Sequence, residues 1–170
     1  MEIFWLLIRW IHVIAAVVWI GGNLILAMVI VPYFRQNLPP VQRIQLLTQI
    51  GKRFEPIVWG CVGILFFTGI ANIFEAIGLG SSSGSEGINS FMRTLLIKLI
   101  LFIALLILTA LHGFVFGPRL SAAIEGLDPE TEELPPQVKQ LRKQMSIVSS
   151  FMGVVSLLIL LAAVALRMGI

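Results

Sequence analysis

The sequence predicts an all-α integral membrane protein: a bundle of four transmembrane helices, with a short amphipathic interfacial helix between the first two. Three observations predict this class. Hydrophobic residues make up 58% of the 170 residues and charged residues only 12%, about half of the roughly 25% that is usual in soluble domains. The mean hydropathy is +0.97. Four apolar stretches are each long enough for the roughly 20 helical residues that cross a bilayer. A chain of this size cannot hide so much apolar surface from water, which argues against a soluble enzyme, a nucleic-acid-binding protein and a disordered protein.

The four stretches are expected to be helices, because only helices satisfy their own backbone hydrogen bonds in lipid without closing a barrel. We expect one domain over residues 1–170, with helices at about residues 3–31, 57–77, 94–116 and 147–166. No basic segment precedes the first stretch, and no small-residue cleavage site stands out. We therefore expect it to remain as a transmembrane helix rather than to act as a signal peptide.

The first connection contains the predicted amphipathic helix. After a pair of prolines, apolar residues recur at helical spacing among polar ones, at Val41, Ile44, Leu47 and Ile50. This pattern is typical of a helix that lies in the membrane interface. The second connection, residues 78–90, is rich in Gly and Ser, and the third combines the acidic run 125–133 with a basic segment.

The distribution of basic residues predicts the orientation in the membrane. Of the 12 Lys and Arg residues, eight fall on the first and third connections: Arg35, Arg43, Lys52, Arg53, Arg119, Lys139, Arg142 and Lys143. Because Lys and Arg are enriched in cytoplasmic loops, we expect these two connections in the cytoplasm and both termini outside.

Polar side chains within the predicted spans are the candidate functional residues, because burying ionisable groups in lipid is costly. In the first helix, His12, Trp19 and Asn23 share a stripe at helical spacing. The third helix carries Lys98 and His112 on one face, about 21 Å apart along the axis. Since the first and third helices run parallel, we expect His12 and Lys98 at one level near the outer end, and His112 near the inner end.

Each of these two levels contains candidate ligands. The outer layer is predicted to contain His12, Lys98, Arg9, Glu75, Met168 and the interfacial Trp5 and Trp10. The inner layer is predicted to contain His112, Asn23, Met28, Cys61, Met145 and Met152. Imidazole, thioether and thiol groups suit Cu(I), and His with Met also suits haem iron. The alternative is structural, because methionines commonly fill gaps in cores and a lone cysteine commonly packs as a small apolar residue.

Several short stretches carry a family resemblance. They are Trp10-Ile11-His12 with Trp19-Ile20-Gly21-Gly22, Arg53-Phe54, Thr68-Gly69-Ile70, and Leu95-Leu96-Ile97-Lys98-Leu99 with Pro118-Arg119-Leu120. In this order and spacing they resemble the CopD (copper resistance D) family, with His112 standing where many relatives have Asn. The resemblance implies a protein of a bacterial-type inner (plasma) membrane that takes part in copper resistance and copper passage. The pairing of His with Lys is similar, more distantly, to HemJ, a four-helix haem-associated protoporphyrinogen oxidase, which implies haem b instead.

Three functional hypotheses stay open at this point. The first is copper binding and passage, with an outer site at His12, Lys98 and Trp19, and an inner site at His112 with Met28, Met152 or Cys61. The second is a b-type haem redox protein, with His12 and either Met168 or a group from a second chain as axial ligands, and a second haem at His112. The third is a non-catalytic subunit of a membrane complex, in which both histidines are replaceable.

The expected partners follow from these hypotheses. They are the lipid bilayer, copper or haem, and either a second copy of the chain or a larger membrane complex, but no nucleic acid. The sequence contains no hydrolase or nucleophile motif. An enzymatic role therefore stays open only as an oxidoreductase that binds haem.

Overall fold

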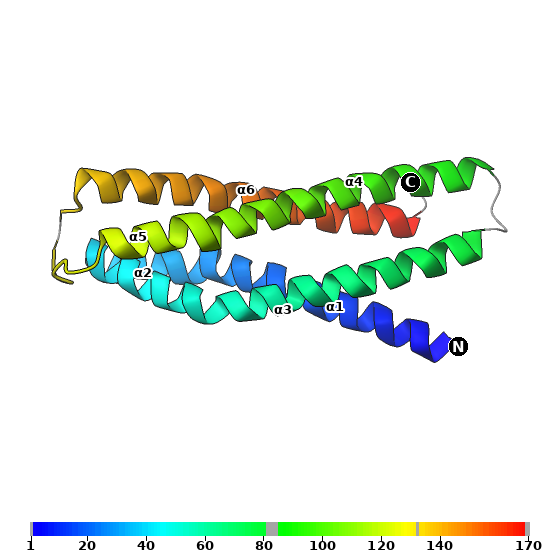
Figure 1. Ribbon diagram of the computed structural model, residues 1–170, viewed down its shortest axis with the longest axis horizontal. Helices are drawn as coiled ribbons and strands as arrows, with labels where there is room; N and C mark the ends of the chain where they lie inside the picture. The colour runs from blue at the N-terminus through cyan, green and yellow to red at the C-terminus, as the bar shows by residue number, and fades with distance from the viewer. Residues whose placement is uncertain (1, 81–84, 132, 169–170) are drawn as a thin grey trace.

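The computed structural model describes residues 2–80, 85–131 and 133–168, with side chains described at 2–75, 92–131 and 133–165. In these residues the chain forms four long helical rods that lie side by side (Figure 1). Each rod contains a stretch that is long and apolar enough to cross a membrane: Glu2–Asn37, Pro40–Glu75, Met92–Ala123 and Pro136–Ala165. The predicted class, an all-α protein with four transmembrane helices, is confirmed.

Two of the rods contain a short π-helical segment. The first rod consists of α1 (Glu2–Ile25), η1 (Leu26–Ile30) and α2 (Val31–Asn37), and the third of α4 (Ser85–Ala110), η2 (Leu111–Phe116) and α5 (Gly117–Ala123). Each π-helical segment ends just before a proline, Pro32 or Pro118, whose missing backbone N–H breaks the regular hydrogen-bond ladder. The second and fourth rods are single helices, α3 (Pro40–Gly80) and α6 (Pro136–Met168).

Successive rods run in opposite directions along the bundle (Figure 1). The α2–α3 and α5–α6 connections lie at one end, here called the loop end, and the start of α1 and the last turns of α6 lie at the other, here called the terminal end. The rods associate in two antiparallel pairs, because α1 packs mainly along α3, and α4 mainly along α6. Both basic connections therefore lie at the same end, as the orientation argument requires.

The segment predicted as a separate interfacial helix forms the first turns of α3. It is helical as expected, but α3 continues through Pro56 without a break. Val41 and Ile44 are buried against Leu120 and Val138 from α5 and α6, so the apolar side of this segment packs inside the protein and not into the interface. Pro56 within the helix costs a backbone hydrogen bond, yet α3 is continuous on both sides of it.

At three other places the helices extend beyond the predicted ends. The third rod extends past residue 116 through α5, and α6 begins at Pro136, so the basic segment before residue 147 is the start of a helix. The predicted Gly/Ser connection 78–90 is helical up to Gly80 and again from Ser85, while residues 81–84 lie outside the described part of the chain. Helical length was underestimated because the polar ends of transmembrane helices lack an apolar signal.

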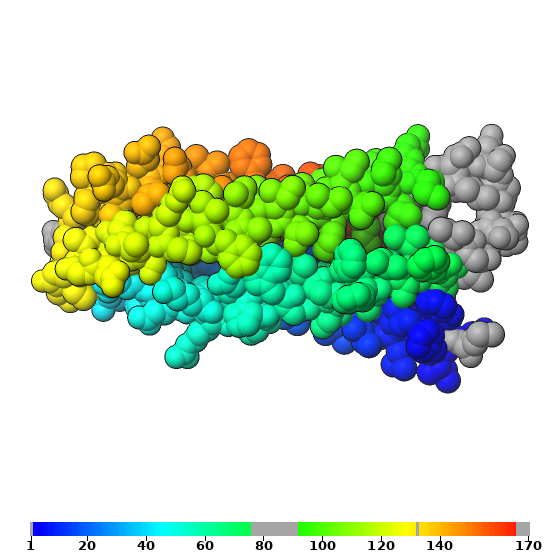
Figure 2. Space-filling view, in the orientation of Figure 1, coloured from blue at the N-terminus to red at the C-terminus, as the bar shows by residue number. Residues whose placement is uncertain are grey.

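Apolar side chains form two internal clusters and cover much of the outer surface. The larger cluster lies in the middle of the bundle and consists of Ala15, Trp19, Val58, Cys61, Val62, Leu65, Leu105, Met152 and Ile159. The smaller lies at the loop end and consists of Val41, Ile44, Leu120, Ile124, Leu134 and Val138. Other large apolar side chains, such as Phe67 and Phe74, point outward, and Figure 2 shows one such face, formed by α3 below and α4 with α5 above. A surface with so many exposed apolar side chains fits lipid better than water.

Candidate functional site

His12 projects from α1 toward α3 and forms a hydrogen bond with Thr68. The His12 Nδ1 and Thr68 Oγ1 atoms are 2.8 Å apart, and the Thr68 hydroxyl also lies 2.6 Å from the Ile64 carbonyl oxygen. A hydroxyl has one proton and a carbonyl can only accept, so the Thr68 hydroxyl donates to Ile64 and accepts from Nδ1–H. These hydrogen-bond roles assign the tautomer: in the neutral imidazole, Nε2 carries the lone pair.

A charged residue from the other helix pair lies close to the same imidazole. Lys98 of α4 is near enough to His12 for an electrostatic interaction, so the structure brings together the two residues that were expected at one level. Gly69 lies on the α3 side, where a Cβ atom would meet His12 Cε1 at 3.6 Å. The imidazole is therefore enclosed by two helices of one pair and by a lysine from the other.

An ion pair lies between His12 and the terminal end of the bundle. The Arg9 guanidinium contacts both carboxylate oxygens of Glu75, with Nη2 2.9 Å from Oε1 and Nε 3.2 Å from Oε2. Asn72 lies one turn further in, and its Oδ1 atom is buried with no hydrogen-bond partner among the described residues. His12 therefore lies beneath a polar layer that joins α1 to α3.

His112 repeats the His12 arrangement near the loop end. It lies in the π-helical segment η2, and its Nδ1 atom is 3.3 Å from the Ser149 Oγ atom of α6. Ser149 also donates to the Met145 carbonyl oxygen at 2.9 Å. By the same reasoning, Ser149 accepts from Nδ1–H, and the lone pair of the neutral imidazole is on Nε2.

The charged residue beside His112 has the opposite sign to Lys98. Glu55 of α3 interacts electrostatically with His112, and its Oε1 atom lies 3.1 Å from where a Cβ atom of Gly113 would stand. The absence of a side chain at Gly113 lets this carboxylate approach η2. Next to it, the Trp59 and Phe114 rings stack with centroids 5.2 Å apart, so an aromatic pair covers the site on one side.

Sulfur atoms lie between the two histidine levels. Cys61 and Met152 belong to the buried central cluster, together with Trp19, which is 1% exposed and packs edge-to-face on Phe102. The helical rise places Cys61 about 10 Å from the level of Thr68. Met152 lies one turn from Ser149 on α6. The Trp19 Nε1 and Thr109 Oγ1 atoms are buried here without a described hydrogen-bond partner.

One candidate ligand is not part of these sites: Met28 lies on η1 with 72% of its surface exposed. The side chain of another, Met168, lies outside the described residues. Within the described part of the chain, no three His, Cys, Asp or Glu side chains gather closely enough to hold a metal ion. The structure thus presents two separate imidazoles, one at each end, rather than a closed metal cage.

Sequence reasoning missed the groups that orient the histidines. Thr68 entered only through the family resemblance, and Ser149 was not among the candidate residues. Glu55 was not considered, although it is an acidic residue at the start of an apolar stretch. The spacing of Thr68, Asn72 and Glu75, four and then three residues, does mark a polar stripe on α3 and was a usable signal.

Comparison with known proteins yields one family and one relative. The sequence model of the family described as Copper resistance protein D (CopD) matches residues 48–166. This range is well over half of the chain and includes Glu55, Cys61, Lys98 and His112, whereas His12 precedes it. An uncharacterized protein of Aquifex aeolicus (strain VF5) is 28% identical over 116 residues, which are 66% of this chain and 71% of that protein. No solved structure matches the chain.

Proposed function

Because this chain belongs to the CopD (copper resistance protein D) family and carries four helices suited to crossing a membrane, we propose that it binds copper ions at His12 and His112 and passes them along the bundle between these two levels. Copper is here the transported ion, and the imidazoles are its entry and exit ligands.

The observation that carries the proposal is the hydrogen bond at Nδ1 of each imidazole. Each donates Nδ1–H to a hydroxyl that is itself fixed by a backbone carbonyl. Metal-binding histidines characteristically donate their second ring N–H to a fixed acceptor, most often a carboxylate, a backbone carbonyl or water, which orients the ring and leaves the other nitrogen to bind the metal. Here a fixed hydroxyl takes the place of that acceptor. A histidine that served only to pack would not need the same arrangement at both ends.

Buried sulfur atoms could serve as intermediate ligands between the two histidines. A thiol and a thioether are soft ligands that favour Cu(I) over harder cations, and Cys61 and Met152 are both in the central cluster. Each is separated from a histidine level by an axial distance of about 5–10 Å. The copper ion would therefore move between one imidazole, the two sulfurs and the other imidazole in short steps.

The charges beside the histidines make the two ends unequal. The carboxylate of Glu55 attracts a cation at His112, whereas the ammonium of Lys98 repels one at His12. We therefore expect tighter copper binding at the loop end and weaker, more easily exchanged binding at the terminal end.

The test is copper binding by the purified full chain in detergent. Under reducing conditions, Cu(I) is titrated against a chromophoric chelator for the unchanged protein and for the His12→Ala, His112→Ala and doubly substituted variants. We expect His112→Ala to remove the tighter site and His12→Ala the weaker one. Met28→Ala, which alters an exposed thioether, is the control and should bind as the unchanged protein does. Equal copper binding by the double variant and the unchanged protein would exclude the proposal.

A second candidate function is one-electron transfer through haem b. The same Nε2 atoms could bind haem iron, which supplies the redox change when bound. The predominantly apolar cluster between the two histidine levels favours this reading, because electrons need no continuous series of ligands. A visible spectrum decides: protein expressed with a haem precursor should show a Soret band that His12→Ala abolishes, and its absence excludes haem. If neither copper nor haem binds, the role as a non-catalytic subunit becomes the better interpretation.

A further inference from the structure

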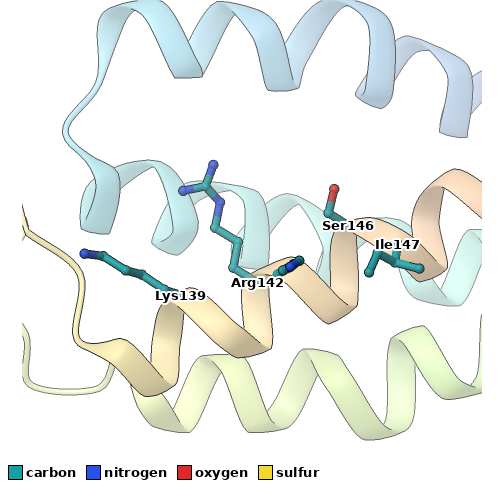
Figure 3. Close-up of a pocket in the computed structure, with 5 residues that line it drawn as sticks. Lys139, Arg142, Ser146 and Ile147 are labelled. Atoms are coloured by element: carbon teal, nitrogen blue, oxygen red, sulfur yellow. The ribbon is translucent and has the colours of Figure 1, made fainter.

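A pocket with a basic lining lies at the loop end of the bundle, apart from both histidines. Its volume is about 330 Å³, and five residues from the first turns of α6 line it: Lys139, Arg142, Lys143, Ser146 and Ile147. Figure 3 shows Arg142 and Ser146 rising from α6 on the same side, toward neighbouring helices, while Lys139 extends toward the loop end. Three cationic side chains and a hydroxyl therefore gather around one opening.

A buried arginine from α3 adds to this positive charge. Arg43 is only 8% exposed and lies near enough to Arg142 of α6, and to Arg35 of α2, to interact electrostatically with each of them. Helices α2, α3 and α6 thus each place an arginine in this region. Such a grouping is unfavourable by itself, because like charges repel one another. We call Arg35, Arg43 and Arg142, with Lys139 and Lys143, the basic cluster.

The described residues do not neutralise the basic cluster. The ion pair between Arg9 and Glu75 lies at the other end of the bundle, and no described carboxylate bonds to Arg43 or Arg142. The described acidic side chains of the nearby α5–α6 loop do not do so either. An uncompensated buried charge is strongly unfavourable. Among the described residues nothing offsets the charge of Arg43, so the arrangement favours the binding of an anion.

We propose that the basic cluster binds the phosphate group of an anionic phospholipid. The guanidinium group of Arg142 would hold the phosphate oxygens, for which its planar donor geometry is suited, and Ser146 would add a hydroxyl donor. Arg43 would strengthen the site through its charge rather than by contact. Basic pockets between transmembrane helices are a recognised type of site for anionic head groups.

The position and the apolar edge of the pocket favour a lipid over a free anion. Helix α6 begins at Pro136, and the pocket lies within its first three turns, on the charged segment that precedes the apolar part of this candidate membrane-spanning helix. Basic residues at such a position lie at the level of the lipid head groups. Ile147 continues the lining toward the bilayer centre and is exposed, which offers contact for an acyl chain. A free phosphate would gain nothing from this aliphatic neighbour.

The test compares lipids of different charge on the purified full chain in neutral detergent. Phosphatidylglycerol, phosphatidylcholine or inorganic phosphate is titrated in, and the thermal unfolding temperature is followed. We expect phosphatidylglycerol to stabilise the protein at concentrations where phosphatidylcholine does not. Arg142→Gln should weaken this binding about fivefold, the usual worth of one basic residue near an anionic membrane surface.

Two further variants separate a binding site from general surface charge. Arg119→Gln removes the same charge from an exposed position at the same end and should leave phosphatidylglycerol binding within twofold. Arg43→Gln should raise the unfolding temperature without lipid, because it relieves like-charge repulsion, and yet reduce the response to phosphatidylglycerol. A merely structural Arg43 would instead lower that temperature.

Three results would overturn the proposal. One is equal stabilisation by phosphatidylglycerol and phosphatidylcholine, and another is an equal loss in Arg119→Gln and Arg142→Gln, which would indicate general surface charge. The third is full competition by millimolar inorganic phosphate, which would assign the pocket to a free anion.

Discussion

Ser149 and Ser150 offer a matched pair of hydroxyls on adjacent positions of α6. Both donate to the carbonyl four residues earlier, but only Ser149 also contacts His112. Because a fixed Nδ1–H bond orients a ligating imidazole, Ser149→Ala should weaken copper binding at the loop end by roughly 10- to 100-fold. Ser150→Ala should leave it unchanged, since it removes the same local bond and nothing else. Equal affinities in the two variants, measured by chelator competition, would show that the bond from Ser149 does not orient His112 for copper binding.

The charged neighbours of the histidines predict effects of opposite sign. Glu55→Gln removes an attractive charge beside His112 and should lower copper affinity there, whereas Lys98→Met removes a repulsive charge beside His12 and should raise it. A change on the order of tenfold is expected in each case, since about 1.4 kcal/mol of interaction corresponds to a factor of 10. The His112→Ala background isolates the His12 site for measuring Lys98→Met. A fall in affinity in that variant would instead make Lys98 a direct ligand.

At the scale of helices, α1 and α3 are in tight contact at Gly22. A Cβ atom at this position would overlap the Phe54 ring, whereas one at Gly21 would meet nothing within 4 Å. Gly22→Ala should therefore destabilise the α1–α3 pair by about 1–3 kcal/mol through overpacking. Gly21→Ala should be neutral or slightly stabilising, because alanine is the better helix former. Thermal unfolding in one detergent measures both, and equal effects would contradict the close contact.

The helices were largely predictable from the sequence because a transmembrane span is an average property of about 20 residues. Their ends were not, as α3 shows: the amphipathic segment after residue 40 was expected to be a separate interfacial helix, but Val41 and Ile44 are buried inside the protein, and the segment forms the first turns of one long helix. Such contacts depend on which rods are neighbours, and neither composition nor periodicity contains that information.

The candidate site could likewise be predicted only where no knowledge of neighbouring helices was needed. The common level of His12 and Lys98 could be inferred from depth alone, because depth follows from position along a helix. The bonds from His12 to Thr68 and from His112 to Ser149 could not, since a serine or threonine in a membrane helix usually bonds its own backbone. Both hydroxyls do so here and bind an imidazole as well.

For the whole molecule, the division into two helix pairs decides how the parts work together. Each histidine is bonded within its own pair, His12 between α1 and α3 and His112 between η2 and α6. Each also faces a charge from the other pair, Lys98 or Glu55. The central cluster, with Cys61 and Met152, contains residues of all four rods. Copper passage would therefore run along the contact between the pairs, and its rate should depend on the sulfurs in the middle more than on either end.

Copper flux into sealed proteoliposomes tests this dependence. Met152→Ala and Cys61→Ser should each slow Cu(I) entry severalfold while leaving equilibrium binding at the histidines close to that of the unchanged protein, because the sulfurs are intermediate ligands. Met28→Ala is the matched control for the methionine, since it makes the same substitution on an exposed side chain and should not alter the flux. A flux that falls equally in Met28→Ala and Met152→Ala would place the route outside the bundle. A flux unchanged in both sulfur variants but lost in His12→Ala and His112→Ala would mean that the ion crosses the central cluster without sulfur ligands.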